Sequence, residues 1–336
     1  MESTMKALVL EGVGEPLLIK QVPIPAIGEQ HALVRLKAAA FNRRDWWIQR
    51  GQYAGLKFPI ILGSDGSGVV DAVGDTRQNG HWVGRDVIIN PGLNWVEDSE
   101  AQPAGFGILG LPENGTFAEY VRVPVRNLYD KPEHLSFEEA AALPLGGLTS
   151  YRALFRKAGL SRGERILITG VGGGVATLAL QWAVNIGAEV YVTSGSESKI
   201  KRAIDGGAIA GVDYRNADWA DRLKELAGGF DVIVDSALGD GFVHLLELAN
   251  PGGRIVFFGG TSGNLPALDG RRIFWKQLQI KGTTMGSSVD FENMLALAEK
   301  NQIKPLIDSV IPWQRAQEGI YKMSSSTQFG KIVLKF

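Results

Sequence analysis

The second half of the chain alternates between short apolar runs and segments whose apolar residues recur at helical spacing. The intervening segments, such as Ala217 to Ala227 and Gly241 to Ala249, predict crossover helices. The apolar runs predict six strands near residues 165–169, 189–193, 211–214, 231–235, 254–258 and 278–283. Strands and helices in strict alternation indicate an α/β fold with a doubly wound parallel six-stranded Rossmann sheet.

The first 125 residues have a different pattern of apolar and polar positions. Short alternating or apolar runs at Met5–Leu10, Leu17–Val22 and Ala32–Ala38 are separated by Gly and Pro, and this predicts a β-rich domain. Residues 42–51 predict one helical segment within it. The tail predicts helices at 291–300 and 314–323 and a strand at 331–336 that rejoins this first domain. We therefore expect a catalytic domain of residues 1–125 and 287–336, and an inserted dinucleotide-binding domain of residues 126–286.

A glycine-rich turn follows the first strand of the predicted Rossmann sheet. Ile166–Ile168 read as a buried strand, and a helical pattern begins after the glycines that follow it. Free backbone amides and the positive end of the helix dipole would both point at this turn, which makes it an anion site. Glycine allows the tight bend and the close approach of a pyrophosphate. We expect dinucleotide contacts at Gly172, Gly173, Gly174 and Val175, with Ala176 as the small third residue of the motif.

The net charge and the cysteine content of the chain exclude several classes of function. The chain has 336 residues, no cysteine and a formal net charge of -1. Near-zero net charge gives no electrostatic footprint for nucleic acid or an anionic membrane surface. The absence of cysteine excludes disulfides and every zinc site that needs thiolate ligands. No apolar run reaches spanning length and the first residues lack a signal-peptide core, so a cytoplasmic protein is expected.

The tip of the second Rossmann strand bears on the choice of cofactor. NAD sites place an Asp or Glu there to accept hydrogen bonds from the adenosine ribose. This strand ends in Thr193-Ser194-Gly195-Ser196, with Lys199 and Arg202 on the following helix. Small hydroxyls and cations suit a 2′-phosphate, and we therefore predict NADPH. The alternative is that Lys199 and Arg202 form an ordinary solvated helix face.

The arrangement resembles the medium-chain dehydrogenase/reductase superfamily, in particular its zinc-independent quinone oxidoreductase-like (zeta-crystallin-like) branch, over nearly the whole chain. The metal ligands of the zinc alcohol dehydrogenases correspond here to Asn42, Ser64 and Leu145, none of which supplies a thiolate or imidazole. The resemblance implies a GroES-like catalytic domain and no metal. The motifs that carry it are Ala40-Phe-Asn-Arg-Arg-Asp45, Leu62-Gly-Ser-Asp-Gly-Ser-Gly-Val-Val70, Gly115-Thr-Phe-Ala-Glu-Tyr-Val121, the glycine-rich turn and Phe329-Gly-Lys-Ile-Val333.

The resemblance also implies a reaction, in which hydride passes from NADPH to a quinone or an α,β-unsaturated carbonyl acceptor. Asn42 and Tyr53 are the candidate catalytic donors. Their alternative roles are a helix N-cap for Asn42 and an exposed loop aromatic for Tyr53. The cofactor contacts that it implies outside the turn are Thr149, Tyr214, Ser236, Leu238, Phe258, Gly259 and Gly330, in addition to Ser194 and Lys199 at the tip of the second strand.

Two other functions stay open from the sequence. An enoyl reductase acting on 2-alkenals or 2-enones would share the cofactor geometry. A non-catalytic NADPH-binding protein, crystallin-like or redox-sensing, would bind the nucleotide without turnover. We also expect a homodimer, because the last predicted strand, residues 278–283, leaves a free sheet edge that could pair with its symmetry mate.

Overall fold

A computed structural model describes residues 3–336, and the chain divides into two units. The first unit comprises residues up to Gly146 together with Gly286–Phe336, and the second comprises Gly147–Met285. The sequence placed the first boundary at 125/126. The structure keeps residues 126–146 in the first unit, because Leu128–Asp130 pairs with Asp86–Ile89 and the helix Phe137–Ala141 packs on four strands of that unit.

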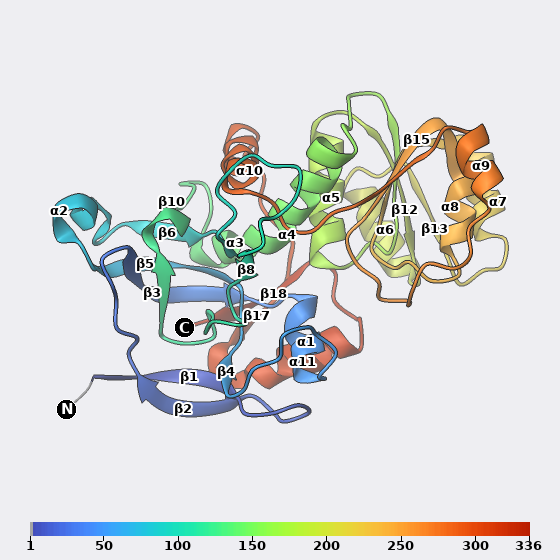
Figure 1. Cartoon of the computed structure of the whole chain (residues 1–336). Coiled ribbons are helices and arrows are strands. Elements are labelled where there is room, and N and C mark those ends of the chain that lie inside the picture. The colour runs from blue at the N-terminus through green and yellow to red at the C-terminus, as the bar shows by residue number, and fades with distance from the viewer. Residues whose placement is uncertain (1–2) are drawn as a thin grey trace. The chain divides into compact units, whose positions relative to one another are not determined.

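The first unit is β-rich, as predicted (Figure 1). Its main sheet has the order β10-β6-β5-β3-β18-β17, with β9 also paired to β3, and a smaller sheet has the order β2-β1-β4. Its elements are β1 (Thr4–Leu10), β2 (Leu18–Pro23), β3 (His31–Ala40), α1 (Arg43–Gln49), β4 (Ile60–Ile61), β5 (Asp65–Val73), α2 (Thr76–Asn79), β6 (Asp86–Ile89), β7 (Gly92–Leu93), β8 (Gly107–Ile108), β9 (Tyr120–Pro124), β10 (Leu128–Asp130), α3 (Phe137–Ala141), α10 (Ser288–Lys300), β17 (Ile307–Pro312), α11 (Ala316–Ser324) and β18 (Lys331–Lys335).

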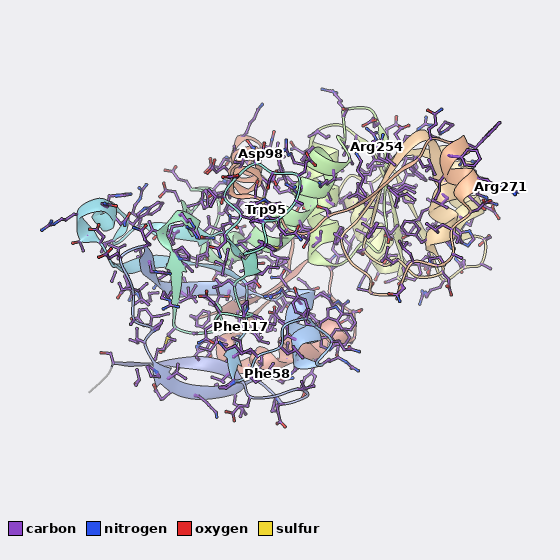
Figure 2. The ribbon with its side chains drawn as sticks, viewed as in Figure 1. Phe58, Trp95, Asp98, Phe117, Arg254 and Arg271 are labelled. Carbon is purple, nitrogen blue, oxygen red and sulfur yellow. The ribbon has the colours of Figure 1, made fainter. Side chains whose placement is uncertain are left out.

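The core of the first unit packs around aromatic and aliphatic side chains from both ends of the chain. Phe117 (Figure 2) is fully buried, and its ring meets that of Phe41 edge to face at 4.8 Å between centroids. Ile332 and Leu334 of β18 belong to the same cluster. The tail therefore rejoins the first domain as predicted, and β17 is a strand that the sequence reading missed.

The second unit contains the predicted parallel sheet of six strands, with the order β13-β12-β11-β14-β15-β16. Helices α5 and α6 cover one face, and α7, α8 and α9 cover the other (Figure 1). Its elements are β11 (Arg165–Ile168), α5 (Gly174–Asn185), β12 (Glu189–Ser194), α6 (Glu197–Asp205), β13 (Ala210–Asp213), α7 (Trp219–Ala227), β14 (Phe230–Asp235), α8 (Phe242–Leu248), β15 (Ala249–Phe257), α9 (Gly270–Trp275) and β16 (Gln279–Gly282), preceded by α4 (Pro144–Tyr151) and a π-helical segment, η3 (Arg152–Lys157).

Strand order 3-2-1-4-5-6 by position along the chain is the arrangement in which a dinucleotide binds at the carboxyl ends of the central strands. In this sheet β11 is central, between β12 and β14. The glycine-rich turn leaves β11 at its carboxyl end, so the fold places the predicted anion site where such ligands bind. Within residues 3–336, every helix is too short or too polar to cross a lipid bilayer.

Candidate functional site

Three buried polar side chains of the first unit form a closed cluster. The register of β3 against its neighbours pairs Ala40 with Asp65 on one side and with Val333 on the other. Two residues beyond Ala40, Asn42 therefore lies opposite Lys331. The Lys331 Nζ donates to Asn42 Oδ1 at 2.7 Å and to Asp65 Oδ2 at 2.8 Å, and Asn42 Nδ2 donates to Asp65 Oδ2 at 2.9 Å. We call this the Asn42–Asp65–Lys331 cluster.

The cluster fixes the orientation of the Asn42 amide. Lysine has only donors and an ionised carboxylate only acceptors, so the amide oxygen must face Lys331 and the amide nitrogen must face Asp65. One of the two amide hydrogens is used by Asp65. The second has no partner among the described residues. Asn42 is also the N-cap residue of α1, as the alternative interpretation required, but its side chain serves the cluster.

Asp65 is fully buried and saturated with donors. Its second oxygen, Oδ1, accepts from the backbone N–H of Leu145 at 2.8 Å. The side chain of Lys331 is only 3% exposed and that of Asp65 is 0% exposed, so the pair is a buried ion pair. A buried carboxylate needs such compensation because removal from water penalises its charged form.

Asp45, one turn into α1, is the second buried carboxyl group of this region. It accepts from the backbone N–H of Asn42 at 2.8 Å and of Gly63 at 3.3 Å. Burial raises the pKa of Asp45 to about 6, against the opposing influence of Arg44, the two backbone donors and Lys331. A carboxyl group with this pKa changes protonation near neutral pH, so the charge of the region depends on pH.

The donor set around Asn42 does not fit zinc. Zinc takes thiolate, imidazole or carboxylate ligands in a tetrahedron. The positions that the resemblance assigns to the zinc ligands carry here the Asn42 amide, the hydroxyl of Ser64 and the side chain of Leu145. The remaining carboxylate, Asp65, already pairs with an ammonium group. Within the described range, no group of three or more His, Cys, Asp or Glu side chains is placed to hold a metal ion.

In the second unit, the glycine-rich turn has the geometry of an anion site. Gly170 and Gly172 adopt positive φ of 63° and 139°, conformations that favour glycine. Gly173 is the N-cap of α5 and offers no side-chain acceptor to the first amides of that helix. A Cβ built on Gly173 would meet nothing within 4 Å. The turn therefore presents unsatisfied amides on an open side, which is what a diphosphate requires.

The residues at the tip of β12 hold the turn and flank it. The Ser194 hydroxyl is buried and donates to the carbonyl of Val171 at 3.1 Å, so Ser194 shapes the turn. The side chain of Lys199 lies over Gly172, where a Cβ would come within 2.9 Å of the Lys199 Cδ. Tyr214 is half exposed and its phenol packs against Gly195. These contacts bring Lys199 and Tyr214 to the predicted cofactor edge, and their contact with a cofactor stays a prediction.

The loops after β14 and β15 are bonded to each other at the same edge. Asp235 accepts from the amides of Ala237 and Leu238 and from the Thr169 hydroxyl. Leu238 has a positive φ of 55°. The backbone N–H of Phe258 donates to the Asp235 carbonyl at 3.2 Å, and a Cβ on Gly259 would lie 2.9 Å from the Ser236 carbonyl oxygen. The structure thus gathers the predicted residues Ser236, Leu238, Phe258 and Gly259 at one end of the sheet.

The other two predicted cofactor residues have clear structural roles. Thr149 of α4 is buried, and its hydroxyl lies 4.0 Å from the Met285 sulfur within the second unit. Gly330 belongs to the first unit and has φ of 106°, and a Cβ there would approach the Leu306 carbonyl oxygen to 2.2 Å. Only glycine fits at this position. Contact of Thr149 and Gly330 with a cofactor stays a prediction.

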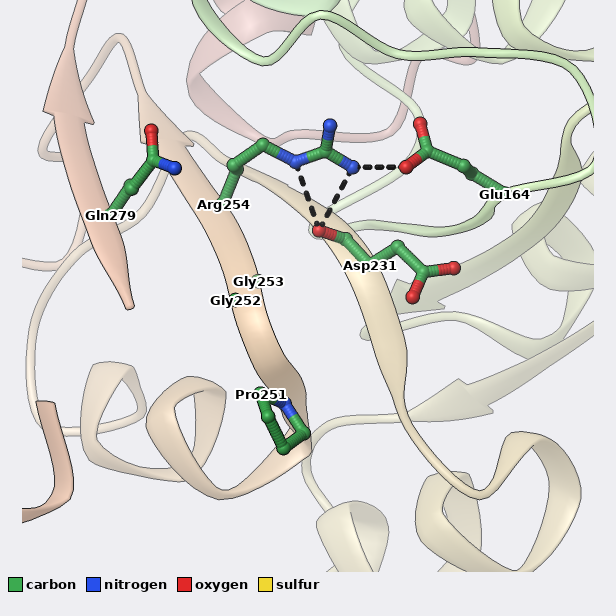
Figure 3. Close-up of a pocket in the computed structure, with 7 residues that line it drawn as sticks. All are labelled: Glu164, Asp231, Pro251, Gly252, Gly253, Arg254 and Gln279. Atoms are coloured by element: carbon green, nitrogen blue, oxygen red, sulfur yellow. Dashed lines mark hydrogen bonds and ion pairs between the residues drawn. The ribbon is translucent and has the colours of Figure 1, made fainter. Parts of the chain in front are cut away.

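A separate polar pocket of about 320 Å³ lies at the opposite end of the Rossmann sheet. Figure 3 shows that Arg254 spans it, bonded to the Glu164 carboxylate and the Asp231 carbonyl. Its lining comes from the amino ends of strands, among them Asp231 of β14 and Gln279 of β16. Ligands of doubly wound sheets bind at carboxyl ends, so this pocket is not the candidate dinucleotide site.

The sequence reading missed three residues that organise these sites. Lys331 was noted only within the closing motif, and its signal was a lone charge that begins an apolar strand. Arg44 was noted only within the motif of Asn42. Asp235 ends an apolar strand, at the position where an acidic side chain can organise the following loop. The partners of Lys331 lie 266 and 289 positions away in the sequence, so no local pattern could identify them.

Comparisons with known proteins identify the family. The model described as "Alcohol dehydrogenase GroES-like domain" matches residues 28–133, and that described as "Zinc-binding dehydrogenase" matches residues 174–300. The zinc-type alcohol dehydrogenase-like protein YogA of Leptosphaeria maculans is 33% identical, over 95% of this chain and 94% of that protein. Acryloyl-coenzyme A reductase of Sulfurisphaera tokodaii is 29% identical, over 98% of this chain and 100% of that protein.

A solved structure supports the same assignment. The crystal structure of an NAD-dependent alcohol dehydrogenase is 37% identical, with a TM-score of 0.89 over 99% of this chain and 100% of the other. The predicted GroES-like and Rossmann fold classes are therefore confirmed. From the extent of these matches, the chain belongs to the medium-chain dehydrogenase/reductase superfamily, whose members are nicotinamide-dinucleotide-dependent oxidoreductases.

Proposed function

We propose that the protein is a zinc-independent, NADPH-dependent reductase that transfers hydride to an α,β-unsaturated carbonyl compound or a quinone. The observation that carries this proposal is the Asn42–Asp65–Lys331 cluster. Its ammonium and carboxylate charges pair with each other, and it holds the Asn42 amide so that one amide hydrogen is left to donate to a ligand. Such a donor stabilises negative charge on an acceptor oxygen without a Lewis acid.

The bound nicotinamide supplies the hydride in this proposal, and the chain supplies binding and electrostatics. The unpartnered amide hydrogen of Asn42 and the hydroxyl of Tyr53 would donate to the acceptor oxygen. Fixed donors lower the barrier because they need no reorganisation as charge develops. Lys331 holds the Asn42 amide in the required orientation through its bond to Oδ1.

The preference for NADPH rests on the tip of β12. The strand ends with Ser194, Gly195 and Ser196, without a carboxylate to accept from the ribose hydroxyls, and Lys199 lies beside the turn. Because a similar solved structure is described as that of an NAD-dependent alcohol dehydrogenase, the KM for NADPH must be compared directly with the KM for NADH. We expect a lower KM for NADPH than for NADH, and Lys199→Met should raise the KM for NADPH about tenfold while leaving that for NADH nearly unchanged. Equal KM values for both cofactors would contradict this preference.

The acceptor class is tested directly by turnover. A panel of quinones and 2-alkenals, followed by the loss of NADPH absorbance, separates a quinone reductase from an enoyl reductase. The similarity to a protein described as acryloyl-coenzyme A reductase favours adding enoyl thioesters to the panel. Tight NADPH binding without turnover of any acceptor would instead indicate the non-catalytic binding protein. Activity that a chelator abolishes and zinc restores would refute the metal-free proposal.

We also propose that the protein is a homodimer. Strand β16 pairs with β15 on one side, and its other edge is unpaired among the described residues. The preceding helix, α9, ends in Phe274 and Trp275, whose exposed fractions are 66% and 83%. An unpaired strand edge can pair with a second copy of the chain, and such pairing would also remove the exposed aromatic side chains from water.

A further inference from the structure

Arg44 is a buried cation whose charge opposes the rise in the pKa of Asp45 but which makes no ion pair with that carboxyl group. It lies on α1, only 7% exposed, and donates from Nη1 to the Ser64 hydroxyl at 2.7 Å and to the Leu109 carbonyl at 2.8 Å. Its Nη2 donates to the Leu111 carbonyl at 3.3 Å. All of these acceptors are neutral, and within residues 3–336 the guanidinium makes no ion pair. A guanidinium stays charged in proteins, so this positive charge is permanent.

Arg44 also contacts Tyr53, the second candidate donor. Its Nε donates to the Tyr53 Oη at 3.4 Å, and its guanidinium lies over the phenol ring at 5.1 Å from the centroid. Arginine has no acceptor, so the Tyr53 oxygen must be the acceptor in this bond. The phenol proton is then left for another acceptor, and no described residue takes it.

The hydroxyl of Ser64 makes its hydrogen bonds within the set of contacts around Arg44. It accepts from Arg44 and donates to the Leu109 carbonyl at 2.8 Å. Ser64 occupies a position that corresponds to a metal ligand in the zinc enzymes, and here it supports the guanidinium. Ser64 and the Leu109 carbonyl therefore both serve as hydrogen-bond partners of Arg44.

We propose that Arg44 is a positioning residue for Tyr53, which it holds as a proton donor and whose oxygen it stabilises once the proton has left. This role rests on the proposed function. For an enone, hydride from the reduced nicotinamide forms a new C–H bond at the β-carbon, and the nicotinamide is oxidised. The C=C electron pair shifts so that negative charge develops on the carbonyl oxygen. Tyr53 gives its proton to that oxygen, which leaves an enol and a phenolate held by Arg44. A proton from solvent restores Tyr53, and the enol becomes the saturated carbonyl compound by gaining a solvent proton at the α-carbon and losing its hydroxyl proton to water.

A purely structural role for Arg44 makes a different prediction. Its bonds to the carbonyls of Leu109 and Leu111 also tie α1 to the loop around β8. If this were its only role, replacing Arg44 would lower activity by the same factor whether or not the Tyr53 hydroxyl is present. Coupling between the two side chains therefore distinguishes the two roles.

The experiment is a double-mutant cycle on the full-length protein with NADPH and a 2-alkenal. Tyr53→Phe should lower kcat about 100-fold, as expected for loss of a proton donor. Arg44→Met should lower kcat about 10- to 100-fold when Tyr53 is present, and less than about 3-fold in the Tyr53→Phe background. Arg50→Met is the matched control, because Arg50 is an exposed arginine of the same region that also lies over an aromatic ring, that of Trp46. Its kcat should stay within about 2-fold of the parent.

The outcomes separate cleanly. Equal losses from Arg44→Met in both backgrounds would overturn the positioning role. If Arg44→Met does not fold, Arg44→Lys keeps the charge but loses the Nε donor to Tyr53. It should lower kcat about tenfold with Tyr53 present and hardly at all in the Tyr53→Phe background, and equal losses again overturn the role. Absence of turnover by the parent protein with every acceptor would remove the proposed function and this role together.

Discussion

Replacing Lys331 by methionine should destabilise the first unit strongly. The change keeps the length of the side chain and removes one charge from a pair whose members are 3% and 0% exposed. Asp65 would keep its bonds from Asn42 and Leu145 but lose its counter-charge, and Asn42 Oδ1 would lose its donor. Breaking a buried pair by removing one partner costs about 3–5 kcal/mol. For a unit of about 200 residues this corresponds to a fall in Tm of about 6–20 °C.

Urea denaturation followed by tryptophan fluorescence would measure this loss, with calorimetry as a second probe. The matched control is Lys335→Met on the same strand, since Lys335 pairs with Glu138 at 2.7 Å but is 62% exposed. An exposed pair of this kind contributes less than about 1 kcal/mol. The combined variant Asp65→Leu with Lys331→Met should lose less than the sum of the two single changes, because no unpaired charge remains. A loss from Lys331→Met as small as that from Lys335→Met would refute the reasoning.

Three further predictions concern other features of the chain. Burial raises the pKa of Asp45 to about 6 from an ordinary value of 3.8, so the folded chain keeps a proton that the unfolded chain releases. The stability that this group contributes is full below about pH 4 and is lost as the pH rises through about 6, a change on the order of 3 kcal/mol. The difference in unfolding free energy between Asp45→Asn and the parent should therefore move in favour of the variant by that amount between about pH 4 and pH 7, and a constant difference would contradict it. Gly173→Asp should abolish NADPH binding in a fluorescence titration without lowering Tm, because the added Cβ meets open space and the carboxylate repels the diphosphate. The same change at Gly241, the N-cap of α8, should leave binding intact, and equal effects at both glycines would argue against the turn as the anion site. Trp275→Glu should convert a dimer to a monomer in light scattering at micromolar concentration, whereas a monomeric parent protein would refute the dimer itself.

The Rossmann half of the fold could be predicted from the sequence because its signals are local. Each strand is a short apolar run, each helix has its own periodicity, and the turn at Gly172 needs glycine for steric reasons that act within a few residues. Strand β17 was missed because Ile307–Pro312 contains an aspartate, a serine and a proline and sits at a position of mixed exposure. The boundary near residue 146 depends on pairing between strands, which local pattern does not reveal.

The candidate site was predictable only in part. Asn42 and Tyr53 came from the resemblance, and the structure shows what surrounds them: an amide locked by Lys331 and a phenol held by Arg44. The contact of Asn42 with Lys331 joins residues 289 positions apart, and it depends on the register of β3 with β18. A shift of register by one residue would turn Lys331 to the other face of the sheet. Long-range register is therefore the information that the sequence reading lacked.

The distance along the chain between Asp65 and its counter-ion bears on how the protein is made. A ribosome must add 266 residues after Asp65 before Lys331 exists, and the whole second unit is synthesised in that interval. At about 5–20 residues per second this delay lasts roughly 13–50 s. During it the carboxylate cannot be sealed from water without its partner, so the nucleotide-binding unit, which is continuous in sequence, can fold first. We therefore expect the β-rich unit to close last, after translation has supplied β17 and β18.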